Sequence, residues 1–253
     1  MQLYPIKSKL IQEGDSLTSR LKEALAPSRL RIEEGDIIAV ASKVVSLSEG
    51  SLVSLSKVKP TSLAKTLGTR HGMRPDFVQV ILDQADRVYG GVSGAILTII
   101  AGNASANSGV DQKNAPKDKV IPWPENANKS ADRFRASLLR ESGKDVGVVI
   151  VDSRVTPLRL GTTGMAIGCS GLRPVTDFRG TKDLYGRKVR ITFRAVADEI
   201  AAAAHLLMGE TDEAIPFVLV RDAPVEIRKN PKGKMTLPIE DCLYMSQIPK
   251  PTS

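Results

Sequence analysis

Apolar residues recur along this chain at two spacings, one typical of helices and one typical of strands. Residues 16–26 carry leucine and alanine on one helical face, and Pro27 follows them, so the pattern predicts a helix that ends before the proline. Alanine dominates residues 195–208 up to Gly209, and because alanine has the highest helix propensity, one continuous helix is expected there. Helical spacing also predicts helices over residues 61–69, 75–89 and 130–141.

Short runs of β-branched residues lie between the helical patterns and predict buried strands. These runs cover residues 37–45, 95–100, 147–151 and 216–220. The first run would place Ser42 and Lys43 near the end of its strand. Because helical and strand patterns alternate, the sequence predicts a mixed α/β or α+β architecture.

The remaining segments have the composition of connections. Residues 115–129 are rich in proline, asparagine and lysine and are expected to form a surface connection. Residues 229–238 and 249–253 are expected to be mobile. No internal repeat is present. The chain is therefore expected to form one domain over residues 1–253, with a tail over 221–253 and with two lobes as an alternative.

Composition and charge indicate which class of molecule the protein binds. The 253 residues are 42% hydrophobic and 25% charged, which is enough to bury a sizeable core. A net charge of +8 would suit nucleic acid, but only 4% of the residues are aromatic and few stacking platforms result, so anionic small molecules are the expected partners. Two cysteines without CxxC spacing, no signal-peptide pattern and no 18-residue apolar run predict a reduced, cytoplasmic chain with no membrane partner.

Three glycine-containing clusters combine carboxylates with small polar residues. They cover residues 107–114, 152–171 and 177–187. Carboxylate oxygens suit divalent cations, and small residues let backbone N–H groups approach phosphate, so the combination indicates a metal–nucleotide site. Asp111 lies in a turn after a predicted strand, where it would hold a cation or act as an Asx-turn cap. Asp152 and Ser153 end another predicted strand, where they would present ligand groups or cap a following turn.

Basic side chains and one glutamate complete the candidate chemistry. Arg159 precedes two glycine-rich stretches that suit anions, although the Gly-Lys-Ser/Thr of a Walker A loop is absent. The third cluster is either a structural ion-pair network or part of a catalytic site. The residues in question are Asp177, Arg179, Asp183 and Arg187, and of these Arg187 is expected to pair with Asp183. Glu210 directly follows the predicted helix end and is expected either to reach back into a site or to remain a solvated charge.

The order of these motifs along the chain is more specific than any one of them. The series begins with Gly-Asp-Ile-Ile-Ala-Val-Ala-Ser-Lys-Val-Val-Ser at 35–46, continues through the three clusters, and ends with Ala-Val-Ala-Asp-Glu-Ile-Ala at 195–201 leading to Met208 and Gly209. In this order the motifs resemble those of the coenzyme F420-0:L-glutamate ligase family, the γ-glutamyl ligases that add glutamate to a deazaflavin cofactor precursor. The resemblance runs from about residue 10 to about residue 220.

The resemblance implies an α+β fold of mixed sheets and helices, the γ-glutamyl ligase fold, in an intertwined homodimer. It also implies GTP as the energy source, Mn²⁺ or Mg²⁺ at the active site, and K⁺ as an assisting monovalent cation. By motif, Asp111 and Asp152 would bind one divalent metal, while Ser153 and Glu210 would help to bind a second. The residues that would bind the nucleotide are Lys9, Leu10, Ile11, Gln12, Ser42, Lys43, Asn114, Met208, Gly209, Glu210 and Thr211.

The resemblance also implies a reaction that needs no protein nucleophile. A carboxylate of the deazaflavin precursor attacks the γ-phosphate of GTP, and the amine of L-glutamate then displaces phosphate from the acyl phosphate, leaving an amide and GDP. Metal ions and basic groups would offset the charge of the triphosphate and fix the in-line geometry. Arg159 and Arg179, with Lys43, are the candidates to bind the anionic substrates.

Several positions depart from the family pattern and concern the substrate. Leu47 stands where the family usually has lysine, Ala101 replaces a usual histidine, and Thr162 stands where glutamine is common. Arg154 carries a positive charge at a shifted position, and no role follows for Cys169. Two alternatives therefore stay open. One is a related nucleotide-dependent amide ligase with another carboxylate or amino-acid substrate, and the other is a non-catalytic module that binds nucleotide or nucleic acid.

Overall fold

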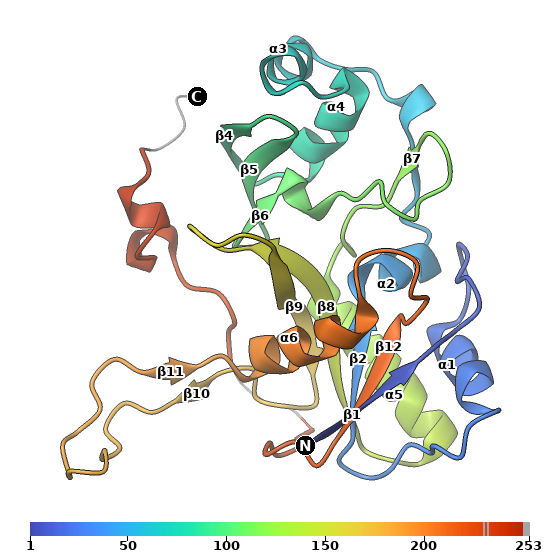
Figure 1. Cartoon of the computed structure of the whole chain (residues 1–253), viewed down its shortest axis with the longest axis vertical. Helices are drawn as coiled ribbons and strands as arrows, with labels where there is room; N and C mark the ends of the chain where they lie inside the picture. The colour runs from blue at the N-terminus through green and yellow to red at the C-terminus, as the bar shows by residue number, and fades with distance from the viewer. Residues whose placement is uncertain (230, 232, 250–253) are drawn as a thin grey trace.

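The computed structural model describes residues 1–229, 231 and 233–249, and its architecture is α+β. A five-stranded sheet forms the larger part of the molecule (Figure 1). Its strands are, in spatial order, β1 (Gln2–Ile6), β12 (Phe217–Arg221), β2 (Ile37–Ala41), β8 (Gly147–Val155) and β9 (Thr162–Ser170). Strands β2 and β8 are parallel, and the other neighbours in this sheet are antiparallel.

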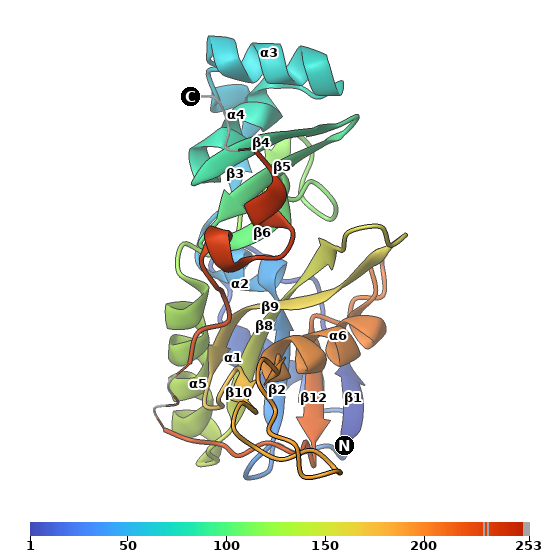
Figure 2. The same ribbon diagram turned by 90° about the vertical axis from the view of Figure 1, so that its left-hand side faces the viewer.

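Helices cover both faces of this sheet (Figure 2). They are α1 (Leu17–Leu25), α5 (Ala127–Ser142) and α6 (Val196–Met208). Side chains alternate between the two faces along a strand, so Ile38 and Val40 of β2 belong to the core that includes α1 and α5, whereas Ile37 and Ala39 pack with α6. The sheet is buried on both faces, and this explains why the sequence of β2 is an unbroken apolar run.

A smaller part of the chain lies at one end of the molecule, at the top of Figure 1. Its elements are α3 (Ser62–His71), α4 (Pro75–Gln84), β4 (Arg87–Val92), β5 (Ala95–Ile100) and β6 (Asn103–Ala106). The three strands form an antiparallel sheet. Ala64 and Leu67 of α3, Val78 of α4 and Ile96 of β5 form its core.

Short elements join the two parts. They are α2 (Ser42–Ser48), the strand pair β3 (Val53–Ser54) and β7 (Lys119–Val120), and the 3₁₀ turns η1 (Leu55–Lys57) and η2 (Asn107–Gly109). Two further 3₁₀ turns, η3 (Ile239–Asp241) and η4 (Met245–Gln247), lie in the tail. The chain therefore passes between its two parts close to η2 and α2, and the candidate site lies there.

A long arm extends away from the rest of the molecule (Figure 1). Its base is the two-stranded sheet of β10 (Thr176–Asp177) and β11 (Phe193–Arg194). Leu184, Tyr185 and Ile191 on this arm are largely exposed, as are Leu158 and Leu160 in the turn between β8 and β9. Exposed apolar side chains that gather into one patch are typical of interaction surfaces.

Most of the predicted elements are confirmed. The helices expected over 16–26, 61–69, 130–141 and 195–208 correspond to α1, α3, α5 and α6. The strands expected over 95–100, 147–151 and 216–220 correspond to β5, β8 and β12. Helix α1 begins where Ser16 accepts a hydrogen bond from the backbone of Ser19, which satisfies one of the free amides of its first turn.

Two expected boundaries are wrong. The run over 37–45 stops being a strand at Ala41, and Ser42 begins α2, whose Val45 packs into the main core. Packing therefore overrides the strand preference of the β-branched residues there. The helix expected over 75–89 ends at Gln84, because residues 87–92 pair with β5 in a hairpin with Ser93 and Gly94 at its turn.

Two segments for which no helix or strand was predicted contain regular or buried structure. Part of the glycine-rich run over 152–171 is β9, one of the two edge strands of the main sheet. Residues 115–129 contain β7, the buried Trp123 and the start of α5, so this segment is only partly a surface connection. Residues 230, 232 and 250–253, within the segments expected to be mobile, lie outside the described residues. In the described part of the chain, no helix combines the length and the apolar character needed to cross a membrane.

Candidate active site

A cavity of about 830 Å³ lies at the carboxyl ends of the parallel strands β2 and β8. Open sheets commonly bind ligands at this edge, where loops from several strands meet. The cavity is lined by residues 8–13, by α2, by the loop that follows Asp111, by residues 151–153 and by residues 208–216. The sequence-predicted residues that line it are Lys9, Leu10, Ile11, Gln12, Ser42, Lys43, Asp111, Asn114, Asp152, Ser153, Met208, Gly209, Glu210 and Thr211.

Backbone pairing holds Asp111 in place. Its N–H and C=O groups exchange hydrogen bonds of 2.9 Å with Ile121. Before it, Asn107 and Ser108 adopt positive φ angles in η2, and the Ser108 hydroxyl lies 3.1 Å from that of Thr98. The side chain of Asp111 accepts a hydrogen bond of 2.7 Å from the N–H of Lys113, so the Asx-turn interpretation of this aspartate holds. One carboxylate oxygen of Asp111 remains for a charged partner.

Asp152 lies within β8, next to a register shift between Ile150 and Val151. Because β8 continues to Val155, the alternative that Asp152 caps a following turn is wrong. The indole N–H of Trp123 donates a hydrogen bond to the Asp152 carboxylate. Burial raises the pKa of Asp152, and the negative charge of Asp111 acts in the same direction.

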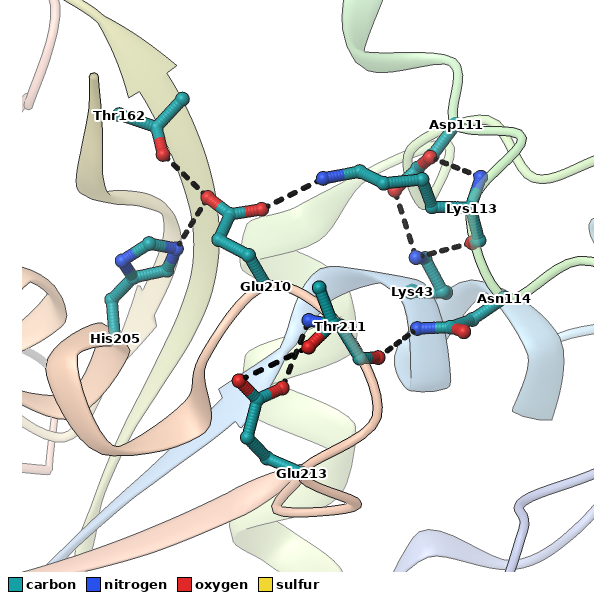
Figure 3. Close-up of polar contacts among 9 residues, drawn as sticks. All are labelled: Lys43, Asp111, Lys113, Asn114, Thr162, His205, Glu210, Thr211 and Glu213. Carbon is teal, nitrogen blue, oxygen red and sulfur yellow. Dashed lines mark hydrogen bonds and ion pairs between the residues drawn. The ribbon is translucent and has the colours of Figure 1, made fainter. Parts of the chain in front are cut away.

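Glu210 reaches into the cavity directly after the end of α6. Gly209 allows this turn because its φ of 73° suits glycine. The carboxylate of Glu210 accepts a hydrogen bond from the Thr162 hydroxyl, and it lies 2.9 Å from Lys113 Nζ and 3.2 Å from His205 Nε2 (Figure 3). Burial alone would raise the pKa of Glu210, but the hydrogen bonds from Thr162 and Lys113 lower it.

Two lysines contact the acidic side chains of the cavity (Figure 3). Lys43 Nζ lies 2.8 Å from a carboxylate oxygen of Asp111, and Lys113 Nζ lies 2.9 Å from Glu210. The hydrogen bond with Glu210 raises the pKa of Lys113, and the charges of Asp111 and Asp152 add to this effect. The Lys113 ammonium therefore lies in the field of all three carboxylates.

Asn114 ties two loops of the cavity together. Its backbone has a φ of 57°, which asparagine tolerates better than most residues. Its side-chain amide donates a hydrogen bond of 2.6 Å to the carbonyl of Thr211. The N–H of Thr211 in turn donates to Glu213. The loop after Asp111 and the loop after α6 are thereby held side by side (Figure 3).

The donor set of the cavity fits a divalent cation. Among the described residues, no three carboxylate, imidazole or thiol groups converge into a ready metal site. Asp111 and Asp152 are nevertheless close enough for the charge of one to raise the pKa of the other, and a cation between two such carboxylates would relieve that repulsion. Hard carboxylate and hydroxyl oxygens are the ligands that Mg²⁺ and Mn²⁺ prefer.

The two arginines expected to bind substrates do not line this cavity. Arg179 lies on the arm, where it forms an ion pair of 2.8 Å with Asp177 and stacks on Phe193. Arg159 lies in the exposed turn between β8 and β9. Arg187 forms an ion pair of 3.1 Å with Asp183, so that expected structural pair is confirmed.

Three residues of the site were missed by sequence reasoning. Trp123 lies in a segment that looked like a surface connection, and its only signal was being the single tryptophan. Lys113 lies between two predicted site residues, Asp111 and Asn114, and this position was its signal in the sequence. His205 lines the cavity from α6 and contacts Glu210. No signal in the sequence indicated this contact, because the helical pattern predicts the helix but not the partner of an individual side chain.

Comparisons with known proteins show the family of the chain. Residues 5–222 match the sequence profile of the family described as F420-0:Gamma-glutamyl ligase. The chain is 41% identical over 226 residues to the coenzyme F420:L-glutamate ligase of Methanopyrus kandleri, covering 89% of this chain and 87% of that protein. It is 38% identical over 222 residues to the protein of the same name from Archaeoglobus fulgidus, covering 87% of each chain. It is 42% identical over 204 residues to the one from Methanocaldococcus jannaschii, covering 80% of this chain and 81% of that protein.

Proposed function

The chain belongs to the F420-0:gamma-glutamyl ligase family and is a ligase, and on this premise we propose that it joins L-glutamate to the deazaflavin precursor coenzyme F420-0 at the expense of GTP. The observation that carries the proposal is the cavity of about 830 Å³, whose lining includes every residue expected to bind nucleotide or metal. A nucleotide and two small acids are cytoplasmic metabolites, so we assign the reaction to the cytoplasm.

The proposed reaction forms and breaks bonds in two steps. A carboxylate oxygen of F420-0 attacks the γ-phosphorus of GTP, and the bond to the β-phosphate oxygen breaks with loss of GDP. The amine of L-glutamate then attacks the acyl carbon, phosphate leaves, and the amine loses a proton to solvent. The protein contributes position and charge, as in other phosphoryl transfers.

The polar residues predicted for the site have distinct tasks in this proposal. Asp111 and Asp152 would hold one Mn²⁺ or Mg²⁺, and Ser153 and Glu210 would help to hold a second, with K⁺ as an assisting cation. Bound metal would offset the charge of the triphosphate and fix the in-line geometry. Lys43, at the start of α2, would contact phosphate, and the loop joined by Asn114 would hold the rest of the nucleotide.

We also propose that the chain works as an intertwined homodimer with the γ-glutamyl ligase fold. The exposed apolar residues of the arm and of the β8–β9 turn support this, because a second copy would bury them. In such a dimer, Arg159 and Arg179 would reach the cavity of the partner subunit and bind anionic substrate there. The proposal that these two arginines bind substrate therefore depends on the homodimer.

A second candidate is a ligase of the same kind with a different acceptor or amino acid. Leu47, which replaces a usual lysine, lines the cavity and is buried, so one cationic contact expected of the family is replaced by apolar surface. A smaller or less charged substrate would suit that surface. A panel of carboxylate acceptors and amino acids, with nucleoside diphosphate release as the readout, separates the two candidates.

The decisive experiment incubates the purified chain with GTP, Mn²⁺, L-glutamate and F420-0. We expect release of GDP and a product heavier than F420-0 by one glutamyl residue in mass spectrometry. GDP release with other acceptors but not with F420-0 would favour the second candidate. Saturable GTP binding without any GDP release, across several metals and acceptors, would make the chain a non-catalytic nucleotide-binding module.

A further inference from the structure

Two ammonium groups contact the carboxylates that we propose as metal ligands, and they differ in freedom. Lys43 is 21% exposed, and besides Asp111 it donates to the backbone carbonyl of Lys113. Lys113 is 61% exposed and contacts Glu210 through the end of its side chain. One lysine is therefore fixed at two points, whereas the other is held by its terminal group and can swing on a flexible stem.

We propose that Lys113 is an exchangeable counter-ion, which neutralises Glu210 before the divalent cation binds and then moves to the phosphates of the nucleotide. The inference rests on the proposed function, since it takes Glu210 as a metal ligand and the cavity as the nucleotide site. It assigns Lys113 a role in substrate binding.

Charge makes the exchange necessary. The ammonium group of Lys113 lies 2.9 Å from one carboxylate oxygen of Glu210, which a cation bound there would need. A lysine and a divalent cation on the same carboxylate would repel each other strongly. The cation displaces the lysine because a divalent ion gains more from several carboxylates than a single ammonium group does. The released side chain stays in a cavity that would then contain a polyphosphate, and lysine is a common phosphate ligand.

The exchange predicts two effects of opposite sign for Lys113→Met, which keeps the length of the stem and removes the charge. Without nucleotide, the variant should bind Mn²⁺ about two- to fivefold more tightly, which is the range expected for an exposed ion pair that no longer competes. With metal present, it should bind a non-hydrolysable GTP analogue more weakly by a similar factor, because a phosphate contact is lost.

The test measures both affinities by calorimetry on the full chain, for the wild type, for Lys113→Met and for Lys117→Met. Lys117 belongs to the same loop, is exposed, lies outside the lining of the cavity and forms no ion pair within residues 1–229, 231 and 233–249. Lys117→Met therefore controls for the loss of one positive charge at longer range, and we expect it to change neither affinity. Lys113→Arg, which retains the charge, should keep Mn²⁺ binding close to that of the wild type.

The outcomes separate the inference from the function on which it rests. If wild type and Lys113→Met bind Mn²⁺ equally, or if both affinities of the variant fall together, Lys113 is not an exchangeable counter-ion. Tighter Mn²⁺ binding with unchanged binding of the GTP analogue would also overturn the proposal, because the lysine would then repel metal without moving to phosphate. If no protein in the set binds Mn²⁺ or the analogue, the proposed function itself fails.

Discussion

The indole of Trp123 donates a hydrogen bond to the carboxylate of Asp152 and so joins the loop before α5 to strand β8. The indole is only 6% exposed, and it lies so close to Gly109 that a Cβ atom at that glycine would collide with the ring. Packing therefore holds the tryptophan in place, and its hydrogen bond orients the carboxylate of Asp152. Partners of this kind orient metal ligands in many metal sites.

We expect Trp123→Phe to weaken the site without unfolding the protein. Phenylalanine keeps an aromatic ring in the buried position but cannot donate to Asp152, so the carboxylate loses its fixed orientation. Loss of such a partner typically costs roughly 10–100-fold in metal affinity or activity. Ligase activity measured against Mn²⁺ concentration should show a higher metal requirement, with much of the rate recovered at saturating metal. An equal loss of rate at every metal concentration would show that Trp123 does not act through Asp152 on metal.

Asp152→Asn should abolish activity and yet stabilise the metal-free protein at neutral pH. The folded state raises the pKa of Asp152 above its ordinary value of 3.8, so the folded protein binds this proton more tightly than the unfolded chain does. Stability is therefore lost as the pH rises from that ordinary value through the raised pKa. Asparagine carries no charge and avoids this loss.

Thermal melts of both proteins in EDTA, over a range of pH, measure the effect. We expect the variant to melt at a higher temperature at neutral pH and the difference to vanish below the ordinary aspartate pKa of 3.8. Adding Mn²⁺ should stabilise the wild type more than the variant, because the variant lacks one of the proposed carboxylate ligands. A variant that melts lower than the wild type at neutral pH without metal would contradict the prediction.

The sequence allowed most of the candidate site to be predicted, because its residues lie in motifs with a fixed order. Residues as distant along the chain as Lys43, Asp111 and Glu210 do meet in one cavity (Figure 3). The contacts between them could not be predicted, since an ion pair such as that of Lys113 and Glu210 joins residues 97 positions apart. Charge spacing along the chain gives no information on such long-range pairing.

One wrong boundary and one strand that was not predicted have a common cause. Ser42 begins a helix although β-branched residues surround it, and residues 162–170 form a strand although glycines interrupt them. In both places the neighbouring elements decide the conformation: α2 packs on the main core, and β9 pairs along β8. Local preference is a weak guide wherever tertiary contacts supply more free energy than propensity does.

Asp36→Asn is expected to destabilise the fold strongly. Asp36 is 2% exposed and pairs through both oxygens with Arg221, at 2.9 and 2.8 Å, so that it ties the start of β2 to the end of β12. Arg221 would keep only its ion pair of 2.7 Å with the exposed Glu33, so we expect the loss of the buried pair to cost about 3 kcal/mol. Urea unfolding followed by tryptophan fluorescence measures the change. Asp177→Asn, which breaks the exposed pair with Arg179, should cost less than about 1 kcal/mol and serves as the control.

Cys169 should resist alkylation under conditions that modify ordinary thiols. Burial raises its pKa to about 12, with a further contribution from the charge of Asp132, and the thiolate is the reactive form. Peptide mapping after iodoacetamide treatment at mildly alkaline pH should find Cys169 unmodified in the native protein and modified after denaturation. Rapid modification in the native protein would show that the thiol has an ionised population and would reopen the question of a role for it.

Mixed dimers can test whether Arg159 binds substrate across the subunit interface. Arg159 lies in an exposed turn outside the cavity lining of its own chain, so its assignment as a substrate ligand requires a partner subunit. Asp152→Ala removes a cavity residue, and Arg159→Ala removes the residue that would be donated. Each variant homodimer is expected to lose most of its activity. Asp152→Ala removes a metal ligand, and Arg159→Ala removes a bidentate contact to phosphate or carboxylate.

A heterodimer of the two variants, purified with two affinity tags, should recover activity. One of its cavities would lack both residues, but the other would combine an intact Asp152 with an intact Arg159 from the Asp152→Ala subunit. If Arg159 acted within its own chain, neither cavity would be complete and no recovery would occur. Arg187→Ala offers the matched control, because Arg187 pairs with Asp183 on the arm and its loss should leave the homodimer active. A heterodimer that stays inactive while light scattering confirms the dimer would remove Arg159 from the partner's site.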